Sequence, residues 1–377
     1  MKVGITCFAT YGGSSTVAAE LGKALAAHGH EVHFVCRDLP ARLVPLPAGI
    51  HFHPAAALPY PVFEYPPYTV ALASRMTQIA VQYDLDLFHV HYAIPHAVSG
   101  FLAREAEGGR FKLITTLHGT DAQLVGLDPS YHPITRFALE QSDGLIAVSQ
   151  YLADATRDDF QITRPITVIP NAVDTERFRP NGNTTLRRDF APDGEPILAH
   201  LSNFRPVKRV PDVIRAFAAI LRKRPARLLL LGDGPERPAA EQLACELGVY
   251  EHIHFLGPVN EVERFLALAD LFLLLSEIES FGLAALEAMA CGVPVLGYRV
   301  GGVPELVVEG EVGYLAEVGD WNAVAAQALR LFENPSRLAE MKTAARALTE
   351  AKFTLTPFVR AHVDYYERVL RGAPLPA

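Results

Sequence analysis

The chain has 377 residues, and half of them are hydrophobic, which suffices for two α/β domains with a core in each. Its formal net charge of −8 argues against nucleic acid as a general partner, because phosphate binding needs a basic surface. The same acidic balance argues against stable association with an anionic membrane, and no apolar run reaches transmembrane length.

The amino end and the cysteines indicate the compartment. Residues 1–5 lead directly into a predicted strand, without the apolar stretch and cleavage site of a secretory signal. The four cysteines show no metal-ligand or C-x-x-C spacing, and we expect buried free thiols: Cys7, Cys36, Cys245 and Cys291. A cytoplasmic protein is therefore expected.

The first half alternates predicted strands and helices. The sequence G-G-S-S at 12–15 lies between the first strand and a helix over 16–28, where a glycine loop lets backbone N–H groups reach an anion. A tight turn without ligand is the alternative. The stretch 40–67 is rich in proline and aromatic residues and is predicted to be a packed loop, because proline removes backbone donors. The predicted strands cover 2–8, 31–36, 86–91, 112–117, 143–148 and 166–169.

Two strand ends in this half carry polar side chains. His91 ends the strand over 86–91 and His96 follows it, and we interpret both as hydrogen-bonding and packing residues, because no clear further ligand for a metal accompanies them. The sequence H-G-T-D at 118–121 ends the next strand. Small polar residues at such a strand end are typical of a binding crevice.

The second half again alternates predicted strands and helices, after a polar linker at 181–196. The sequence G-D-G at 232–234 lacks the third glycine of a dinucleotide fingerprint, which excludes an NAD site there. The predicted strands cover 197–201, 227–231, 252–256, 270–275, 293–296 and 313–315.

The stretch 276–306 is the most informative. A turn at 280–282 joins a buried strand to a predicted helix over 283–291, with Ser280 as the expected N-cap. Free N–H groups at such a helix start attract phosphate. Glu279 precedes the helix and Glu287 lies eight residues later; ionised carboxylates accept hydrogen bonds from sugar or ribose hydroxyls. From this pair alone, a solvated Glu287 is the alternative.

These motifs together resemble those of a known family. The pattern E-x7-E spanning S-F-G, followed by A-C-G-V-P-V and G-G-V-P-E, resembles the donor-binding segment of family 4 retaining glycosyltransferases of the GT-B fold. Further segments are similar to a subgroup that glycosylates L-malate in bacillithiol biosynthesis: G-G-S-S at 12–15, Y-P-V-F-E-Y-P-P-Y at 60–68, H-V-H-Y-A-I-P-H-A at 89–97, T-T-L-H-G-T-D at 115–121 and S-N-F-R-P-V-K-R at 202–209. The resemblance spans nearly the whole chain. Ser15 departs from it, where the family pattern has glycine.

The expected fold is α/β, with two Rossmann-like, doubly wound domains facing each other across a cleft. Residues 1–170 are predicted to bind the acceptor and residues 171–356 the nucleotide sugar. A C-terminal helix within about 357–377 is expected to pack back on the first domain.

The resemblance implies transfer of N-acetylglucosamine from UDP-GlcNAc to the hydroxyl of L-malate, with retention and without cofactor or metal. The leaving UDP develops negative charge, and Arg205 and Lys208 are cations placed to meet it, unless they form only a solvated basic turn. By family similarity, Glu287 holds the ribose, Glu279 the sugar hydroxyls and the turn 257–259 the uracil. The expected catalytic residues are His118, Glu279, Arg205 and Lys208. The expected donor-binding residues are Gly13, Asn203, Arg205, Lys208, Val259, Glu279, Ser280, Phe281, Gly282, Leu283 and Glu287.

Malate is a small dianion and needs a cation together with hydrogen-bond donors. The expected acceptor-binding residues are Ser14, Ser15, Tyr92, Thr120 and Arg136. An ordinary salt bridge on the helix surface is the alternative for Arg136.

Three other functions stay open at this point. One is a related glycosyltransferase with a lipid, polysaccharide or sugar-phosphate acceptor, another is a UDP-GlcNAc epimerase-like enzyme, and the third is a non-catalytic sugar-nucleotide binding module. The sequence leaves assembly open between a monomer and a homodimer.

Overall fold

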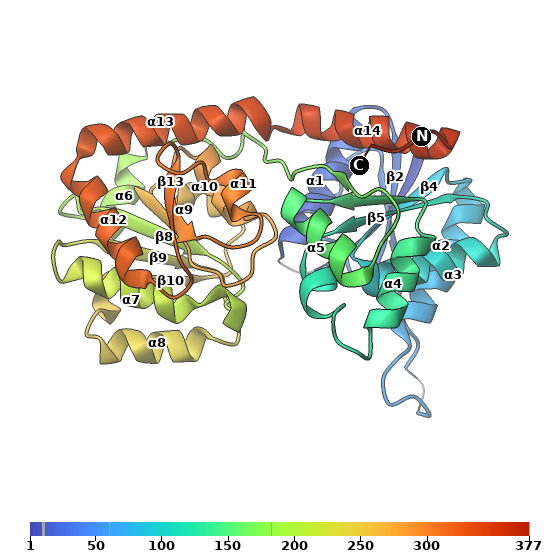
Figure 1. The fold of residues 1–377 in the computed structure, drawn as a ribbon, viewed down its shortest axis with the longest axis horizontal. Coiled ribbons are helices and arrows are strands. Elements are labelled where there is room, and N and C mark those ends of the chain that lie inside the picture. Colours follow the sequence, from blue (N-terminus) through green and yellow to red (C-terminus); the bar gives the residue numbers. More distant parts are fainter. Residues whose placement is uncertain (10–11, 60, 182, 377) are drawn as a thin grey trace. The chain divides into compact units, whose positions relative to one another are not determined.

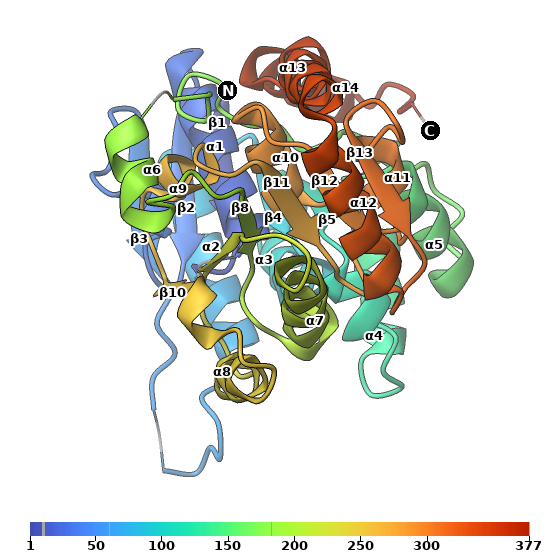
Figure 2. The ribbon, with the colours of Figure 1, turned by 90° about the vertical axis from the view of Figure 1, so that its left-hand side faces the viewer.

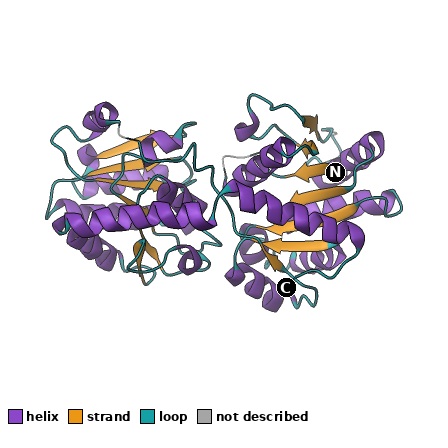
Figure 3. Cartoon of the chain, turned by 90° about the horizontal axis from the view of Figure 1, so that it is seen from above, coloured by secondary structure: helices purple, strands orange, loops and turns teal. Residues whose placement is uncertain are grey.

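The computed structural model describes residues 1–9, 12–59, 61–181 and 183–376. Tyr60 of the segment 60–68, Gly182 of the predicted linker and Ala377 at the chain end lie outside these residues. The chain forms two compact units, one from Met1–Asn171 with Leu355–Ala377 and the other from Ala172–Thr354. Each unit is a parallel sheet with helices on both faces (Figures 1 and 3), which confirms the predicted α/β class.

The first unit contains a seven-stranded parallel sheet in the order β3-β2-β1-β4-β5-β6-β7. Its central strands are buried along their length, because helices cover both faces of a parallel sheet. The strands are β1 Lys2–Thr6, β2 Glu31–Cys36, β3 Ile50–Pro54, β4 Leu87–His91, β5 Lys112–Leu117, β6 Gly144–Ala147 and β7 Thr167–Val168. The helices are α1 Gly13–Ala27, α2 Tyr68–Tyr83, α3 Val98–Ala106, α4 His132–Gln141, α5 Gln150–Phe160 and α14 Leu355–Arg371, with short turns η1 Ala41–Leu43, η2 Ala93–Ala97 and η3 Thr120–Leu124.

Strand β3 corrects the prediction of a packed loop over 40–67. It pairs in parallel with β2 at the edge of the sheet, with His33 opposite His51 and Cys36 opposite Pro54. An edge strand leaves one side unpaired, so Pro54 at its end costs no ladder bond on that side. The surrounding prolines hid a five-residue strand that carries only two apolar side chains, Ile50 and Phe52.

The second unit contains a six-stranded parallel sheet in the order β10-β9-β8-β11-β12-β13. Helices α7 and α12 pack side by side on one of its faces and share one apolar core with the sheet (Figure 2). The strands are β8 Ile197–Leu201, β9 Arg227–Leu231, β10 Ile253–Gly257, β11 Leu271–Leu274, β12 Val295–Tyr298 and β13 Gly313–Ala316. The helices are α6 Thr184–Phe190, α7 Val210–Leu221, α8 Arg237–Glu246, α9 Val262–Leu266, α10 Leu283–Ala290, α11 Val303–Leu306, α12 Trp321–Glu333 and α13 Pro335–Lys352, with short turns η4 Pro206–Lys208 and η5 Tyr250–His252.

Helix α14 belongs to the first unit although it follows the second in sequence. The Tyr366 hydroxyl lies 2.6 Å from Nδ1 of His89, and the Tyr365 hydroxyl donates to the carbonyl of Leu145 at 3.1 Å. Both tyrosines are buried against the sheet. These bonds fix the helix to β4 and β6.

Three of the four cysteines are buried and free, as predicted. Cys245 is exposed on α8, so the prediction was wrong for this thiol. Among the described residues, every helix is too short or too polar to span a bilayer.

Candidate active site

Each sheet has one place where the chain direction reverses, and ligands of open α/β sheets bind there beyond the carboxyl ends of the strands. In the second unit this place lies between β8 and β11. The segments that leave these two strands, 202–209 and 275–282, contain most of the predicted donor-binding residues. Topology alone therefore brings them to one edge of the sheet.

Lys208 and Glu279 meet at this edge. The Lys208 ammonium donates to Oε2 of Glu279 at 2.7 Å, and the two side chains are 22% and 14% exposed. Seventy-one positions separate them in the sequence. The structure therefore pairs one predicted cation with one predicted carboxylate at a partly desolvated position, where charge interactions are stronger than in bulk water.

Helix α10 starts directly beside this pair. Its N-cap is Gly282, with φ of 97°, and no side-chain cap bond is formed among the described residues. The prediction of Ser280 as N-cap was wrong, because the chain turns through the left-handed conformation of Gly282, which glycine adopts without a steric penalty. Leu283 opens the helix. Its first backbone N–H groups suit an anion.

Glu287 is buried, with 5% of its surface exposed. It lies just over one turn from the start of α10. Burial excludes the alternative that Glu287 is a solvated surface residue, since an ionised carboxylate is rarely buried without a partner. It also contributes to raising the pKa of Cys291 to about 12, mainly a consequence of burial of that thiol.

The segment after β8 is held in place by its own contacts. Arg205 is exposed, and it is the N-cap residue of the η4 turn that ends at Lys208. The next residue, Arg209, adopts a left-handed backbone with φ of 46° and binds Asp212 at 2.7 Å. The hydroxyl of Tyr298 also donates to Asp212, at 2.9 Å. Sequence reasoning missed this anchor, because neither Asp212 nor Tyr298 belongs to a motif.

Two buried oxygens at this edge have no hydrogen-bond partner among the described residues. They are Oδ1 of Asn203 and Oγ of Ser276. Buried polar atoms nearly always have a hydrogen-bond partner, so these two oxygens, at the edge where ligands bind, suit donor groups supplied by a ligand. Asn203 was predicted, whereas Ser276 was missed.

His200 also escaped prediction. Its Nε2 lies 2.8 Å from Oγ of Ser202 and its Nδ1 lies 2.9 Å from the carbonyl of Leu273. Burial lowers its pKa to about 4, so the ring is neutral near pH 7. Because both nitrogens of this neutral ring form hydrogen bonds near the end of β8, His200 fixes the start of the segment that carries Lys208.

The glycines at 232–234 have a packing role. A Cβ on Gly232 would lie 1.9 Å from the carbonyl oxygen of Ser202, and one on Gly234 would lie 2.0 Å from that of Asn203. The N–H of Gly232 donates to the carbonyl of Gly257 at 2.8 Å. These contacts fix the turn at 257–259, where Val259 is partly buried.

The remaining predicted donor residues also lie at these carboxyl edges. Phe281 is buried, and its ring centroid lies 5.9 Å from that of Phe353. Ser280 is partly buried in the turn before α10. Gly13 belongs to the first unit, where it is the exposed first residue of α1.

In the first unit the chain direction reverses between β1 and β4. Ser14 and Ser15 lie in the first turn of α1, after β1, and are 8% and 3% exposed. Tyr92 follows β4 with φ of 89°, an uncommon conformation for a large side chain. Thr120 is partly buried at the start of η3. Four of the five predicted acceptor residues therefore lie on segments that leave β1, β4 and β5.

His118 is bound to His91, with Nε2 of His118 2.8 Å from Nδ1 of His91. Burial lowers the pKa of His118 to about 3, which makes it a neutral hydrogen-bonding group near pH 7. His96 binds the carbonyl of His91 at 2.6 Å and packs against Phe8. The prediction that His91 and His96 form hydrogen bonds and pack is confirmed by these contacts.

Asp121 orders the loop that carries His118. Its carboxylate accepts hydrogen bonds from the backbone N–H groups of Ala93, His118 and Gly119, at 2.9 to 3.1 Å. Burial nevertheless raises the pKa of Asp121. The sequence placed Asp121 in the H-G-T-D motif without a role, and the structure gives it one: it ties the end of β4 to the end of β5.

Arg136 is exposed on α4 and forms no ion pair with any of the described residues. The alternative of a salt bridge on the helix surface is therefore not supported. No contact joins Arg136 to the serines of α1 in the part of the chain that the structure describes, so its role with malate stays a prediction.

Comparison with known proteins shows the family to which the chain belongs. The family model for Glycosyltransferase Family 4 matches residues 11–177, and that for Glycosyl transferases group 1 matches residues 183–348. The N-acetyl-alpha-D-glucosaminyl L-malate synthase of Bacillus anthracis is 45% identical over 372 residues, which cover 98% of each chain. A GDP-mannose-dependent phosphatidylinositol monomannoside mannosyltransferase of Mycolicibacterium smegmatis is 31% identical over 73% of this chain and 74% of that protein.

Solved structures support the fold. Anabaena Alr3699/HepE in complex with UDP and glucose superimposes with a TM-score of 0.82 and 21% identity, covering 97% of this chain and 98% of that one. Sucrose-phosphate synthase from Thermosynechococcus elongatus superimposes with a TM-score of 0.83 and 21% identity, covering 99% of this chain and 100% of that one. At these identities the likeness concerns the fold alone, and it confirms the predicted GT-B architecture.

Proposed function

The chain belongs to the glycosyltransferases of family 4, and on this premise we propose that it transfers N-acetylglucosamine from UDP-GlcNAc to the hydroxyl of L-malate with retention at the anomeric carbon. The product is an N-acetylglucosaminyl-malate, in agreement with the resemblance to the subgroup that glycosylates L-malate in bacillithiol biosynthesis. The observation that carries the proposal is the Lys208–Glu279 pair beside the start of α10, in a chain that is 45% identical to an N-acetyl-alpha-D-glucosaminyl L-malate synthase over 98% of its length.

The donor site proposed here works by charge. As the glycosidic bond breaks, the diphosphate gains negative charge, which Lys208, Arg205 and the first N–H groups of α10 stabilise. Lys208 is already held at a fixed position by Glu279. When the diphosphate binds, it draws the ammonium away from Glu279, and the carboxylate is released to accept bonds from sugar hydroxyls.

The nucleoside is assigned to groups around this centre. Glu287, buried in α10, accepts hydrogen bonds from the ribose hydroxyls. The turn 257–259 reads the uracil through its backbone, and the contacts of Gly232 and Gly257 keep that turn rigid. The unpaired oxygens of Asn203 and Ser276 accept further donors of the UDP-sugar.

The first unit is proposed to hold malate. Ser14, Ser15, Tyr92 and Thr120 supply hydrogen-bond donors, and Arg136 supplies a cation. Neutral His118, oriented by His91, lies at the transferred sugar. Retention without an enzymic nucleophile follows from attack on the same face that UDP leaves, where the departing phosphate accepts the proton of the malate hydroxyl.

The test is a product assay by mass spectrometry. Purified enzyme is incubated with UDP-GlcNAc and a panel of acceptors: L-malate, D-malate, other hydroxy acids, sugar phosphates and inositol phosphate. The proposal expects a hexosaminyl adduct of L-malate and release of UDP. Turnover of UDP-GlcNAc without any acceptor indicates an epimerase-like enzyme, and an adduct of another panel member instead of L-malate contradicts the acceptor assignment.

A further inference from the structure

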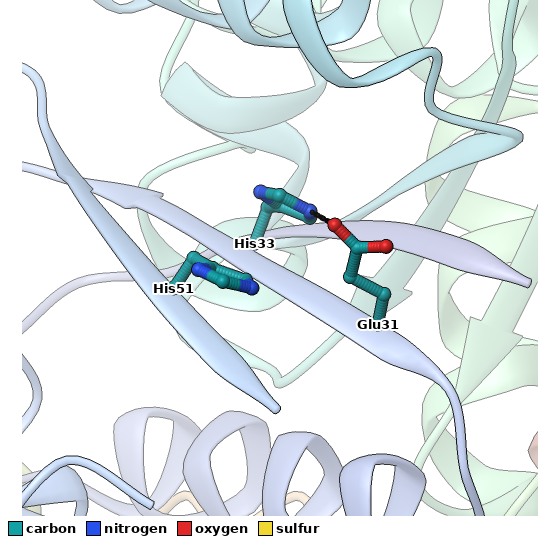
Figure 4. A group of neighbouring side chains, drawn as sticks. All are labelled: Glu31, His33 and His51. Carbon is teal, nitrogen blue, oxygen red and sulfur yellow. Dashed lines mark hydrogen bonds and ion pairs between the residues drawn. The ribbon is translucent and has the colours of Figure 1, made fainter. Parts of the chain in front are cut away.

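A cluster of possible metal ligands lies on β2 and β3 of the first unit, apart from every residue assigned above. Glu31 and His33 are two positions apart on β2, and His51 on β3 pairs in register with His33. Alternate residues of a strand share a face, so all three side chains project from the same face of the sheet. One ligand atom from each lies within 4.8 Å of the other two (Figure 4).

The cluster has a buried side and an open side. Nε2 of His33 lies 2.9 Å from Oε1 of Glu31; the His33 side chain is fully buried, whereas that of Glu31 is 38% exposed. The ring of His51 is exposed and stacks on His33 with 4.8 Å between centroids. A cation can therefore enter from solvent and still meet a buried imidazole.

A second set of side chains fixes the orientation of His33. Its Nδ1 lies 3.0 Å from Nε2 of His53, and the ring of Tyr83 packs against it with 4.4 Å between centroids. Metal-bound histidines usually use their other ring nitrogen in this way, because the second hydrogen bond sets the tautomer and the ring plane.

We propose that Glu31, His33 and His51 bind a zinc-like divalent cation, with water as a fourth ligand. Two imidazoles and one carboxylate suit zinc, whereas magnesium and calcium prefer ligand sets made of oxygen. Zinc bonds to such atoms are about 2.0–2.2 Å long, so the exposed His51 ring rotates slightly inward on binding. The sequence predicted no metal, because the segment that supplies His51 resembled a loop.

The position of the cluster indicates what the ion does. Glu31 begins β2 and His51 is the second residue of β3, so the site lies toward the amino ends of the strands. Gly13 and His118 follow the carboxyl ends of β1 and β5, at the opposite edge of the parallel sheet. The ion would therefore join edge strand β3 to β2 and stabilise the first unit, with no part in glycosyl transfer.

Metal uptake tests this directly. Untagged full-length protein is stripped with chelator, dialysed against zinc and analysed for bound metal; cobalt, as a spectroscopic probe, reports coordination geometry by its visible absorption. The variants are Glu31→Gln and His51→Ala, both at exposed or half-exposed positions, with His28→Ala as the control for an exposed histidine of the same unit. We expect a single bound ion in the wild type and the control, and an affinity weaker by roughly tenfold or more in both variants.

Thermal unfolding supplies an independent readout. Zinc is expected to raise the unfolding midpoint of the wild type and of His28→Ala, because a ligand that binds only the folded state stabilises it. At the same zinc concentration it should raise the midpoint of His51→Ala by less than that of the wild type. Absence of zinc uptake by the wild type, or uptake by both variants equal to that of the wild type, overturns the proposal.

Discussion

Replacing Lys208 by methionine separates charge from packing at the donor site. The substitution keeps the aliphatic stem and removes the ammonium that lies 2.7 Å from Glu279. If this ammonium binds the departing diphosphate, the loss is one charge-assisted hydrogen bond, worth about 1.5–3 kcal/mol. That corresponds to a fall in transfer rate of roughly tenfold to 150-fold. Folding should change little, because a partly exposed ion pair contributes at most about 1 kcal/mol.

The second unit contains a matched control. Lys342 donates to Asp270 at 2.6 Å, and its side chain is 33% exposed. Asp270 immediately precedes β11, so this pair lies at the amino ends of the strands. Lys342→Met should therefore leave transfer and UDP binding intact while it removes a salt bridge of comparable geometry.

Substitutions of Lys208 and of Glu279 should change the affinity for UDP without sugar in different ways. Lys208→Met should weaken UDP binding in isothermal titration calorimetry, because the diphosphate loses its cation and meets the unpaired Glu279. Glu279→Gln should leave UDP binding unchanged or tighter, since Lys208 is freed, yet it should slow transfer because the sugar loses an acceptor. Transfer by Lys208→Met within twofold of wild type, or an equal loss in Lys342→Met, refutes the reasoning.

Four further predictions follow from the same structure. Glu287→Gln should weaken binding of UDP-GlcNAc by roughly tenfold with unchanged folding, since a hydrogen bond to a charged group is lost; unchanged affinity in calorimetry removes Glu287 from the site. Arg136→Ala should raise the KM for malate and leave donor affinity unchanged; an unaltered malate KM in steady-state kinetics contradicts the acceptor set. Burial lowers the pKa of His96, His118 and His362 from 6.5 to about 4, 3 and 4, so below pH 6.5 the unfolded chain binds protons that the folded chain does not. The free energy of unfolding, measured by urea titration, should therefore be highest above pH 6.5 and fall as the pH drops toward 4. A profile that does not change with pH is incompatible with three neutral buried rings. Chelator should leave the initial rate of transfer unchanged even where it lowers the unfolding midpoint, and a rate abolished by chelator and restored by magnesium contradicts a donor site built on protein cations.

The sequence predicted the strand ends well because hydrophobic runs and glycine turns mark them locally. Lys208, Glu279 and Glu287 are recognisable because they flank such marks, and the alternation of strands and helices predicts that they meet at one edge. The bond between Lys208 and Glu279 is not local, since it depends on β8 and β11 becoming neighbours although five helices and strands lie between them in the sequence. No spacing in the sequence encodes it.

The features that the sequence did not predict depend on contacts or backbone conformations that leave no local pattern. Strand β3 has few apolar residues because an edge strand is covered on only part of its surface. Gly282 replaced Ser280 as N-cap because a left-handed turn, rather than a side-chain cap, starts α10. Asp121 and His200 bind backbone groups of Ala93 and Leu273, which the sheets bring close to them, and such partners have no sequence signature.

A crystal structure with UDP bound would show whether protein groups alone neutralise the departing diphosphate. We expect the β-phosphate in hydrogen-bond contact with Nζ of Lys208 and with the first backbone N–H groups of α10 after Gly282, with Arg205 turned toward the same oxygens. A pyrophosphate bound away from residues 205, 208 and 282 would contradict it.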